Sequence, residues 1–593
     1  MTSSLHDQRR RFLAFFAGTG MGATLMPGAL WAQAQASQSG TITLDMVKAA
    51  EQVIGMTFTD AQREMMLDGL NQNHDRIVSL RRIEVANSVD SCLRFSPVVP
   101  GMHFDMTRQP LRLSKAPVVR RPPNLEDVAF WPVTHLAALL RTRQVTSTEL
   151  TRMYIARLKR YDPVLKCVIT LTEDLALEQA AAADAQIAAG HYKGPLHGIP
   201  WGAKDLISRK HVPTTWGAAP YKDQVFDHDA TLVERLDAAG SVLIAKLSSG
   251  ELAGGDTWFG GQTKNPWNPA EGSSGSSAGP ASATAAGCVG FAIGSETTGS
   301  IVGPSTRCSV YGMRPTFGRI SRHGVMTLAW SMDKLGPLCR SVEDIAIVFD
   351  AIRGPDGHDL TVVDMPFNYD ANLDIRTLRV GYVKAAFDEA RPVQEEKDND
   401  AAALARLESM GVKLIPISYP DFPINDIVDI MDTEFAAAFD PLTRSGRDAL
   451  LAHQEKSSDA NLDRTNRFMP AVEYLRTTQL RTLLMQAMAQ TMKDIDVYVA
   501  PITSSRRPSS PSGPPPGGAP AAPRRSLIGI NTALTNLTGH PGVVVRNGIN
   551  ARGQPTSFSF VGQIYGEARM LALAHAYQSA TRWHEAHPPL DFA

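Results

Sequence analysis

The residue types best suited to chemistry are concentrated in one stretch, Gly272–Pro315, which is rich in serine and glycine. A flexible linker of that composition would carry no apolar strand, yet Val289–Ile293 has the pattern of a short buried strand. That strand leads directly into a turn that ends at Ser300. A serine on a turn of backbone N–H groups is well placed for a nucleophile, because those groups can stabilise the oxyanion that it generates. The stretch therefore predicts a nucleophilic serine and not a linker.

A lysine in a second motif could serve as the base that such a serine needs. Lys204 follows Ile199–Ala203, a mostly apolar run that predicts a buried strand. Burial disfavours the ammonium form and lowers the pKa of a lysine, so Lys204 could accept a proton. A surface lysine is the alternative, because lysines are rarely buried.

Three further motifs accompany the Ser/Gly stretch in a fixed order: GPLHGIPWGAKD at Gly194–Asp205, DATLVERLDAAG at Asp229–Gly240 and YGMRPTFGRISRHG at Tyr311–Gly324. Together they resemble the amidase signature family, and the resemblance extends from Pro117 to Pro589. It implies an α/β fold, in the form of an α/β/α sandwich around a large mixed sheet. It also implies hydrolysis of carboxylic amides through a Ser–Ser–Lys triad.

The resemblance assigns a role to each residue of that triad. Ser300 is the nucleophile, Lys204 is the base, and Ser276 passes the proton between them. The spacing from Ser276 to Ser300 equals that of the family, and it aligns Gly287 and Gly294 with family glycines. Ser300 would attack the carbonyl, the amine would leave after protonation, and water would then hydrolyse the acyl-enzyme.

The repeat Gly272–Ser277 leaves a second register open, in which Ser273 or Ser274 would take the place of Ser276. We favour Ser276 because this register aligns with the family without a gap. The resemblance also implies a cis peptide bond before Ser276 and a supporting hydrogen bond from Ser277.

The resemblance places the oxyanion hole at the backbone N–H groups of Thr297, Thr298, Gly299 and Ser300. The family turn usually has the pattern Asp-x-Gly-Gly-Ser, whereas this chain has Glu296 and Thr298 in place of the aspartate and the first glycine. A β-branched residue restricts the backbone, which makes the geometry of the hole harder to predict. In addition, Val302 stands where many members carry arginine, which weakens any expectation of charged-substrate recognition.

Composition and motif content exclude several classes of function. The formal net charge of −1 gives no overall field that would attract nucleic acid or an anionic membrane. The chain has no HExxH motif and its 15 histidines form no ligand cluster, so we expect neither a metal nor a cofactor. Its five cysteines are scattered and indicate neither a zinc site nor a disulfide framework.

Residues 1–36 have the features of a twin-arginine-type signal peptide. The motif Arg9–Leu13 resembles the export signal, an apolar run extends to Trp31, and Ala32–Ala36 offers cleavage sites. An uncleaved membrane anchor is the alternative, because the run approaches spanning length, although its glycines and Pro27 weaken such a helix. We therefore predict a periplasmic or secreted protein without stable membrane insertion once the signal is removed.

The rest of the chain is predicted to divide into a helical extension with a crossing segment, residues 37–115, and a catalytic domain, residues 116–593. The extension is expected to pack on the catalytic domain, with gating or oligomer contacts as alternatives. Alternating patterns, such as the capping box Thr146–Glu149 and a helix capped by Asp229, predict an α/β sheet covered on both sides. The Pro-rich segment 506–525 predicts a solvated surface loop, with a mobile lid as the alternative.

The sequence thus predicts a hydrolase that cleaves the C–N bond of a small-molecule amide, with esterase activity as a side reaction. The glutamine-hydrolysing component of a tRNA-dependent amidotransferase shares the motifs, but it works in the cytoplasm with partner chains, and the export signal argues against it. A non-catalytic exported binding protein is disfavoured by the complete set of Lys204, Ser276 and Ser300. The type of amide (aliphatic, aryl, peptidic or carbamate) and the oligomeric state are left open.

Overall fold

The computed structural model describes residues 41–83, 85–89, 91–391, 393–455, 458–502 and 526–592. The predicted signal peptide, residues 1–36, and the Pro-rich segment, residues 506–525, lie outside the described residues. The chain forms two compact units, residues 1–86 and 87–593. The catalytic-domain boundary at residue 116 stays a prediction. Among the described helices, none combines the length and the apolar content that crossing a membrane requires.

The described part of the first unit contains two helices, α3 (Leu44–Ile54) and α4 (Asp60–Leu80). A capping box around Thr59 begins α4, and both helices lie in the segment that is predicted as a helical extension. The Arg63 guanidinium of α4 pairs with Glu51 of α3 at 2.7 Å and joins the two helices.

The second unit is built on an 11-stranded mixed sheet. In spatial order the strands are β1 (Val168–Leu171), β3 (Val242–Leu247), β2 (Pro200–Lys204), β8 (Phe291–Glu296), β10 (Lys334–Cys339), β9 (Tyr311–Arg314), β14 (Gly542–Ile549), β15 (Pro555–Gly562), β13 (Val497–Pro501), β11 (Val380–Val383) and β12 (Leu414–Ile417). Strand β2 runs parallel to β3 and β8, and β11 runs parallel to β12 and β13. The other neighbours in the sheet pair antiparallel. Two small sheets pair β4 (Thr257–Trp258) with β5 (Gly261–Gln262) and β6 (Lys264–Asn265) with β7 (Asn268–Gly272).

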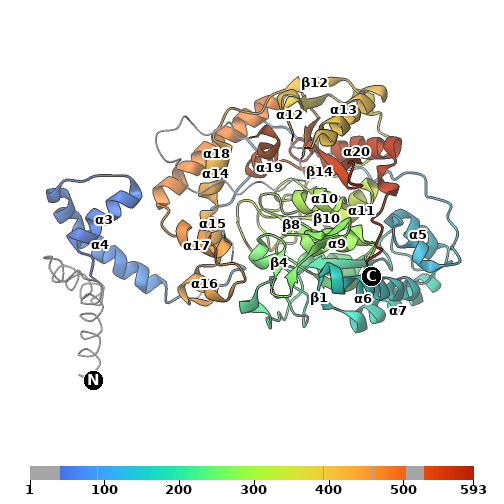
Figure 1. The fold of residues 1–593 in the computed structure, drawn as a ribbon, viewed down its shortest axis with the longest axis horizontal. Helices are drawn as coiled ribbons and strands as arrows, with labels where there is room; N and C mark the ends of the chain where they lie inside the picture. The colour runs from blue at the N-terminus through green and yellow to red at the C-terminus, as the bar shows by residue number, and fades with distance from the viewer. Residues whose placement is uncertain are drawn as a thin grey trace. The chain divides into compact units, whose positions relative to one another are not determined.

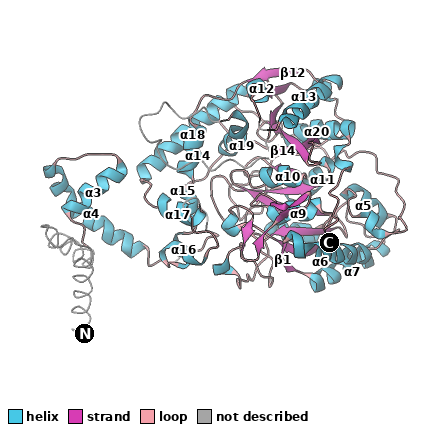
Figure 2. Cartoon of the chain, viewed as in Figure 1, coloured by secondary structure: helices cyan, strands magenta, loops and turns pink. Residues whose placement is uncertain are grey.

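Helices pack around this sheet and confirm the predicted α/β fold (Figure 2). They are α5 (Val133–Arg141), α6 (Ser147–Leu165), α7 (Glu173–Ala188), α8 (Thr231–Ala238), α9 (Ala278–Ala285), α10 (Val302–Cys308), α11 (Val342–Ile352), α12 (Lys384–Asp388), α13 (Gln394–Ser409), α14 (Ile424–Met431), α15 (Thr433–Ala438), α16 (Asp440–Arg444), α17 (Asp459–Asn466), α18 (Ala471–Thr491), α19 (Leu527–Thr538) and α20 (Glu567–Thr581). Figure 1 shows α6 and α7 near β1, and α12 and α13 near β12. Every residue of β2, β3 and β10 is buried, as expected of strands that are covered on both faces.

Two predicted helix starts have different outcomes. The capping box is confirmed, since Thr146 Oγ1 accepts the Glu149 N–H at 3.1 Å and Glu149 accepts the Thr146 N–H at 2.8 Å. The predicted Asp229 cap is wrong, because no side chain caps α8. The Asp229 carboxylate instead accepts the Lys210 N–H at 2.7 Å and lies 3.4 Å from Arg209.

The strand that leads to the predicted nucleophile lies further along the chain than its apolar pattern indicates. The pattern predicts Val289–Ile293, whereas β8 spans Phe291–Glu296 and includes Ser295. Its antiparallel ladder with β10 continues to the pair Glu296 and Lys334. Pairing with a neighbouring strand therefore overrides the weak strand propensity of the glycine and serine in this segment.

A fully buried ion pair lies at the ends of β2 and β3. Lys246 Nζ is 2.8 Å from the Asp205 carboxylate, and both side chains are completely buried. The pair is well satisfied, because Lys246 also donates to Thr214 Oγ1 at 2.7 Å, and Asp205 accepts the Thr215 N–H at 2.8 Å. This pair fixes the segment that carries Lys204.

We expect Asp205→Ala to lower the free energy of unfolding by about 3–5 kcal/mol, because it leaves the buried Lys246 ammonium without a counter-charge. Urea denaturation followed by circular dichroism measures the change. The exposed Asp223 provides a control, and Asp223→Ala should change the stability by less than about 0.5 kcal/mol. Equal stability of the two variants would contradict the role of the pair.

Candidate active site

Lys204 is the last residue of β2 and is completely buried. Its Nζ donates hydrogen bonds to Ser276 Oγ at 2.8 Å and to Ser295 Oγ at 2.9 Å. Strand β2 lies beside β8, and Ser276 lies just before α9. The fold thus brings together two predicted site residues that are 72 positions apart in the chain.

The environment of Lys204 prepares it to accept a proton. Burial lowers the pKa of Lys204 to about 7, while the negative charges of Asp333 and Glu296 oppose the shift. A lysine with a pKa near neutrality is unprotonated in an appreciable fraction of molecules at pH 7, as a general base requires.

The segment around Ser276 is tied to β8 and to the turn after it. The peptide bond between Gly275 and Ser276 is cis, as the family resemblance implies. The Ser277 N–H donates to the Ser300 carbonyl at 3.0 Å. Ser277 Oγ accepts the Ser295 N–H at 3.1 Å and donates to the Ser295 carbonyl at 3.0 Å. Ser277 therefore lies in the supporting position that the resemblance predicts for it.

Ser300 lies in the turn after β8, on the wall of a cavity of about 380 Å³. The predicted oxyanion residues Thr297, Thr298 and Gly299 line the same cavity. Within the described part of the chain, the Ser300 hydroxyl makes no hydrogen bond, whereas the bond between Lys204 and Ser276 is already formed. Catalytic hydrogen bonds of this kind often tighten only when substrate binds.

The backbone of the turn explains how it accommodates Thr298 in place of a glycine. Gly299 has a φ of 132°, a conformation that side chains rarely adopt, whereas Thr298 has a negative φ. A Cβ at Gly299 would lie 3.3 Å from the Thr532 methyl group. The position that requires glycine is therefore 299, and a β-branched residue fits at 298.

Glu296 lies at the start of the turn, and its carboxylate accepts hydrogen bonds from the residues at the end of the turn. One oxygen, Oε2, accepts the N–H groups of Ile301 and Val302, both at 2.8 Å. The other, Oε1, accepts from Arg314 at 3.0 Å and from Asn536 at 2.8 Å. Burial would raise the pKa of Glu296, but the Arg314 charge and these hydrogen bonds bring it below its ordinary value. An ionised, fully bonded carboxylate thus holds both ends of the oxyanion turn.

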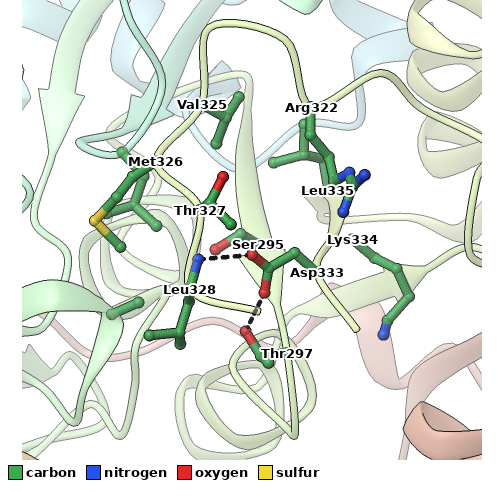
Figure 3. Close-up of a pocket in the computed structure, with 12 residues that line it drawn as sticks. Ser295, Thr297, Arg322, Val325, Met326, Thr327, Leu328, Asp333, Lys334 and Leu335 are labelled. Atoms are coloured by element: carbon green, nitrogen blue, oxygen red, sulfur yellow. Dashed lines mark hydrogen bonds between the residues drawn. The ribbon is translucent and has the colours of Figure 1, made fainter. Parts of the chain in front are cut away.

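Asp333 anchors the same turn through Thr297 (Figure 3). Its carboxylate accepts the Thr297 hydroxyl at 2.7 Å and the N–H groups of Leu328 and Ala329 at 2.8 and 2.9 Å. Burial raises the pKa of Asp333, and the bond from Thr297 opposes the rise. Beside it lies a small cavity of about 10 Å³, also lined by Ser295, which is close to the space of one water molecule.

Sequence reasoning missed three residues of this site. It places Ser295 in a turn, and its predicted network has no second hydroxyl at the lysine. It identifies Glu296 only as a departure from the family aspartate. Asp333 belongs to none of the recognised motifs, so no sequence signal indicates it. Among the described residues, no cluster of three or more histidine, cysteine or acidic side chains could hold a metal ion.

Residues 149–571 match the family model described as Amidase. A Mycobacterium tuberculosis protein that carries the name amidase AmiD is 33% identical over 496 residues, which are 79% of this chain and 98% of that protein. The A chain of the glutamyl-tRNA(Gln) amidotransferase of Roseiflexus sp. is 35% identical over 482 residues, which are 76% of this chain and 96% of that one. The solved structure of the peptide amidase from Stenotrophomonas maltophilia has a TM-score of 0.66 and 27% identity, covering 78% of this chain and 99% of that one.

We expect Glu296→Gln to slow the reaction of Ser300 with a fluorophosphonate probe by about 10²-fold, a loss typical of a damaged oxyanion hole. Both oxygens of Glu296 accept hydrogen bonds from N–H donors. In a glutamine one of these oxygens is replaced by an NH₂ group, which would face the same donors and could not accept from them. The measurement is the rate of labelling, and circular dichroism verifies that each variant is folded. Glu178→Gln, at an exposed position of α7, is the matched control, and equal rates in both variants would exclude an anchoring role for Glu296.

Proposed function

The chain belongs to the amidase family and is a hydrolase of carboxylic amides; from this premise we propose that it works through an acyl-enzyme on Ser300, activated by Ser276 and Lys204. The observation that carries the proposal is the bond of 2.8 Å from the buried Lys204 ammonium to Ser276 Oγ. Through this bond, Ser276 would connect Ser300, which lines the cavity, to a proton acceptor of suitable pKa, Lys204. Because the remaining steps follow from ordinary acyl-transfer chemistry, neither a metal nor a cofactor is needed.

In the proposed reaction, Ser300 Oγ attacks the amide carbon while its proton passes to Ser276 Oγ, which passes its own proton to neutral Lys204. The tetrahedral oxyanion accepts hydrogen bonds from the backbone N–H groups of the turn, whose ends are held by Glu296 and Asp333. Return of the proton through Ser276 allows the amine to leave. Water then attacks the ester on Ser300 by the same relay and releases the carboxylic acid.

The substrate and the cellular location are further parts of the proposal. The similarity to a peptide amidase supports amides of peptides as one candidate class, and activated esters would react by the same route. The similarity to the amidotransferase chain supports glutamine as the second candidate. Export, suggested by Arg9–Leu13, favours a free-standing amidase in the periplasm or outside the cell. Release of ammonia from glutamine by the purified chain alone would favour the second candidate instead.

Treatment with a fluorophosphonate probe should modify one serine, because only an activated nucleophile attacks phosphorus rapidly. Mass spectrometry of the digested protein should place the adduct on Ser300, and Ser300→Ala should prevent it. Modification of Ser273 or Ser274 instead would overturn both the register of the repeat and the assignment of Ser300 as the nucleophile. Absence of any adduct on folded protein would refute the acyl-enzyme proposal.

We expect Lys204→Ala to reduce amide hydrolysis by at least about 10²–10⁴-fold, the usual range for general acid–base catalysis, and to reduce ester hydrolysis less. The departing amine needs a proton, whereas the phenoxide of an activated ester leaves with less help. In the native chain, kcat/KM for an amide should rise with pH through about 7, the pKa of Lys204, and stay high at alkaline pH. The value of kcat/KM rises with pH, and does not fall, because Lys204 can act as a base only when it is unprotonated.

The measurement is kcat/KM against pH for one amide and one activated ester. Lys222→Ala, at an exposed position, is the control and should retain the native profile for both. Equal losses on the two substrates in Lys204→Ala, or an unchanged rise near pH 7, would mean that Lys204 takes no part in proton transfer.

A further inference from the structure

The cavity that contains Ser300 has an acidic wall. Three carboxylates line it: Asp432, between α14 and α15, and Asp459 and Asp463, both on α17. The two on α17 are four residues apart, so they lie on one face of the helix. Among the described residues that line the cavity, none is lysine, arginine or histidine.

Two of these carboxylates, those of Asp463 and Asp432, lack the partners that buried acids usually have, whereas Asp459 is exposed. Asp463 is only 7% exposed, yet no other described residue forms a hydrogen bond or ion pair with its carboxylate. Oδ1 of Asp432 is likewise buried without a partner among the described residues. Elsewhere in the same region acids are paired: Asp448 accepts from Arg464 at 2.6 Å, and Asp440 accepts from Arg444 at 2.5 Å. A buried carboxylate without a partner is costly, which indicates a site that a ligand completes.

The pKa values of Asp432 and Asp463 agree with that interpretation. Burial and the charges of neighbouring acids raise the pKa of Asp432 to about 8. Burial, together with Asp459 and Asp448, raises the pKa of Asp463 to about 7, although Arg464 opposes the rise. A cation in the cavity would reverse these shifts, because an opposite charge favours the ionised form.

Two other features suit a cation. The side chains of Phe435 and Phe439 line the cavity, and aromatic faces attract organic cations. Gly254, also on the wall, lies against Asp459: a Cβ there would be 1.5 Å from Asp459 Oδ2. The absence of a side chain at Gly254 therefore gives this carboxylate its place in the wall.

We propose that the substrate is an amide that also carries an organic cation, such as a primary ammonium, which binds Asp432, Asp459 and Asp463 while the amide carbonyl reaches Ser300. This inference rests on the proposed function, because it assigns the substrate class of the same site. A cavity of about 380 Å³ is within the usual size range for small-molecule sites. Val302, at the position where the family often carries arginine, leaves no positive charge there to repel such a substrate.

The first experiment compares 5-aminopentanoyl anilide with hexanoyl anilide, which have the same chain length and differ in one terminal ammonium. We expect kcat/KM of the native enzyme to favour the cationic anilide by at least about tenfold, chiefly through KM, because hydrogen bonds between charged groups are stronger than those between neutral groups. Asp463→Asn and Asp432→Asn should each reduce this preference. Asp421→Asn, at an exposed position that does not line this cavity, should retain it.

The second experiment does not depend on turnover of either anilide. Pentylammonium should slow fluorophosphonate labelling of Ser300 in the native chain more than 1-pentanol does, and Asp463→Asn should remove the difference. Equal protection by the two compounds, equal kcat/KM for the two anilides, or a preference that persists in both aspartate variants would overturn the cation site. A chain that the probe does not label at all would refute the proposed function itself, which is a distinguishable result.

Discussion

The proposed chemistry of this molecule depends on a buried lysine that has no carboxylate partner. Among the described residues, Lys204 is bonded only to the hydroxyls of Ser276 and Ser295. Lys246, on the adjacent strand and equally buried, is paired with Asp205 at 2.8 Å. These two buried lysines on neighbouring strands therefore have opposite environments. One ammonium is neutralised by an ion pair and stabilises the sheet, whereas the other is left without a counter-charge and can lose its proton.

The turn that carries Ser300 depends on a second constraint, the hydrogen bonds that it and its neighbours make to the carboxylates of Glu296 and Asp333. Glu296 reaches forward to the first N–H groups of α10 and sideways to Arg314 of β9 and Asn536 of α19. Asp333, next to β10, holds the Thr297 hydroxyl. Segments that are far apart in the chain therefore converge on one short turn, and the direction of its N–H groups is set by packing between them. Thr298 itself has a negative φ, which is why a threonine fits at this position of the turn.

The contiguous motifs identified the family, and the resemblance implied both the α/β sheet and the meeting of Lys204 with Ser276. It also predicted the place of Ser277. The sequence could not predict Ser295 as a ligand of Lys204, since a glycine- and serine-rich segment becomes a strand only through its ladder with β10. Asp333 and the acids on α17 were beyond reach for a different reason. The contacts that these acids make, or lack, arise only in the folded chain. No recognised motif surrounds any of them, so the sequence gives no indication of their role.

The depressed pKa of the lysine has a consequence for the whole fold through proton linkage. Lys204 has a pKa of about 7 in the folded chain and an ordinary value of 10.5 when exposed, and burial has the same effect on Lys334. Between these values the unfolded chain binds more protons than the folded one, so the free energy of unfolding rises with pH across that interval. Below pH 7 both ammonium groups must be buried in charged form, and the folded state carries the full penalty. For these two lysines the penalty of burial therefore falls as the pH rises above 7, where Lys204 is also free of its proton.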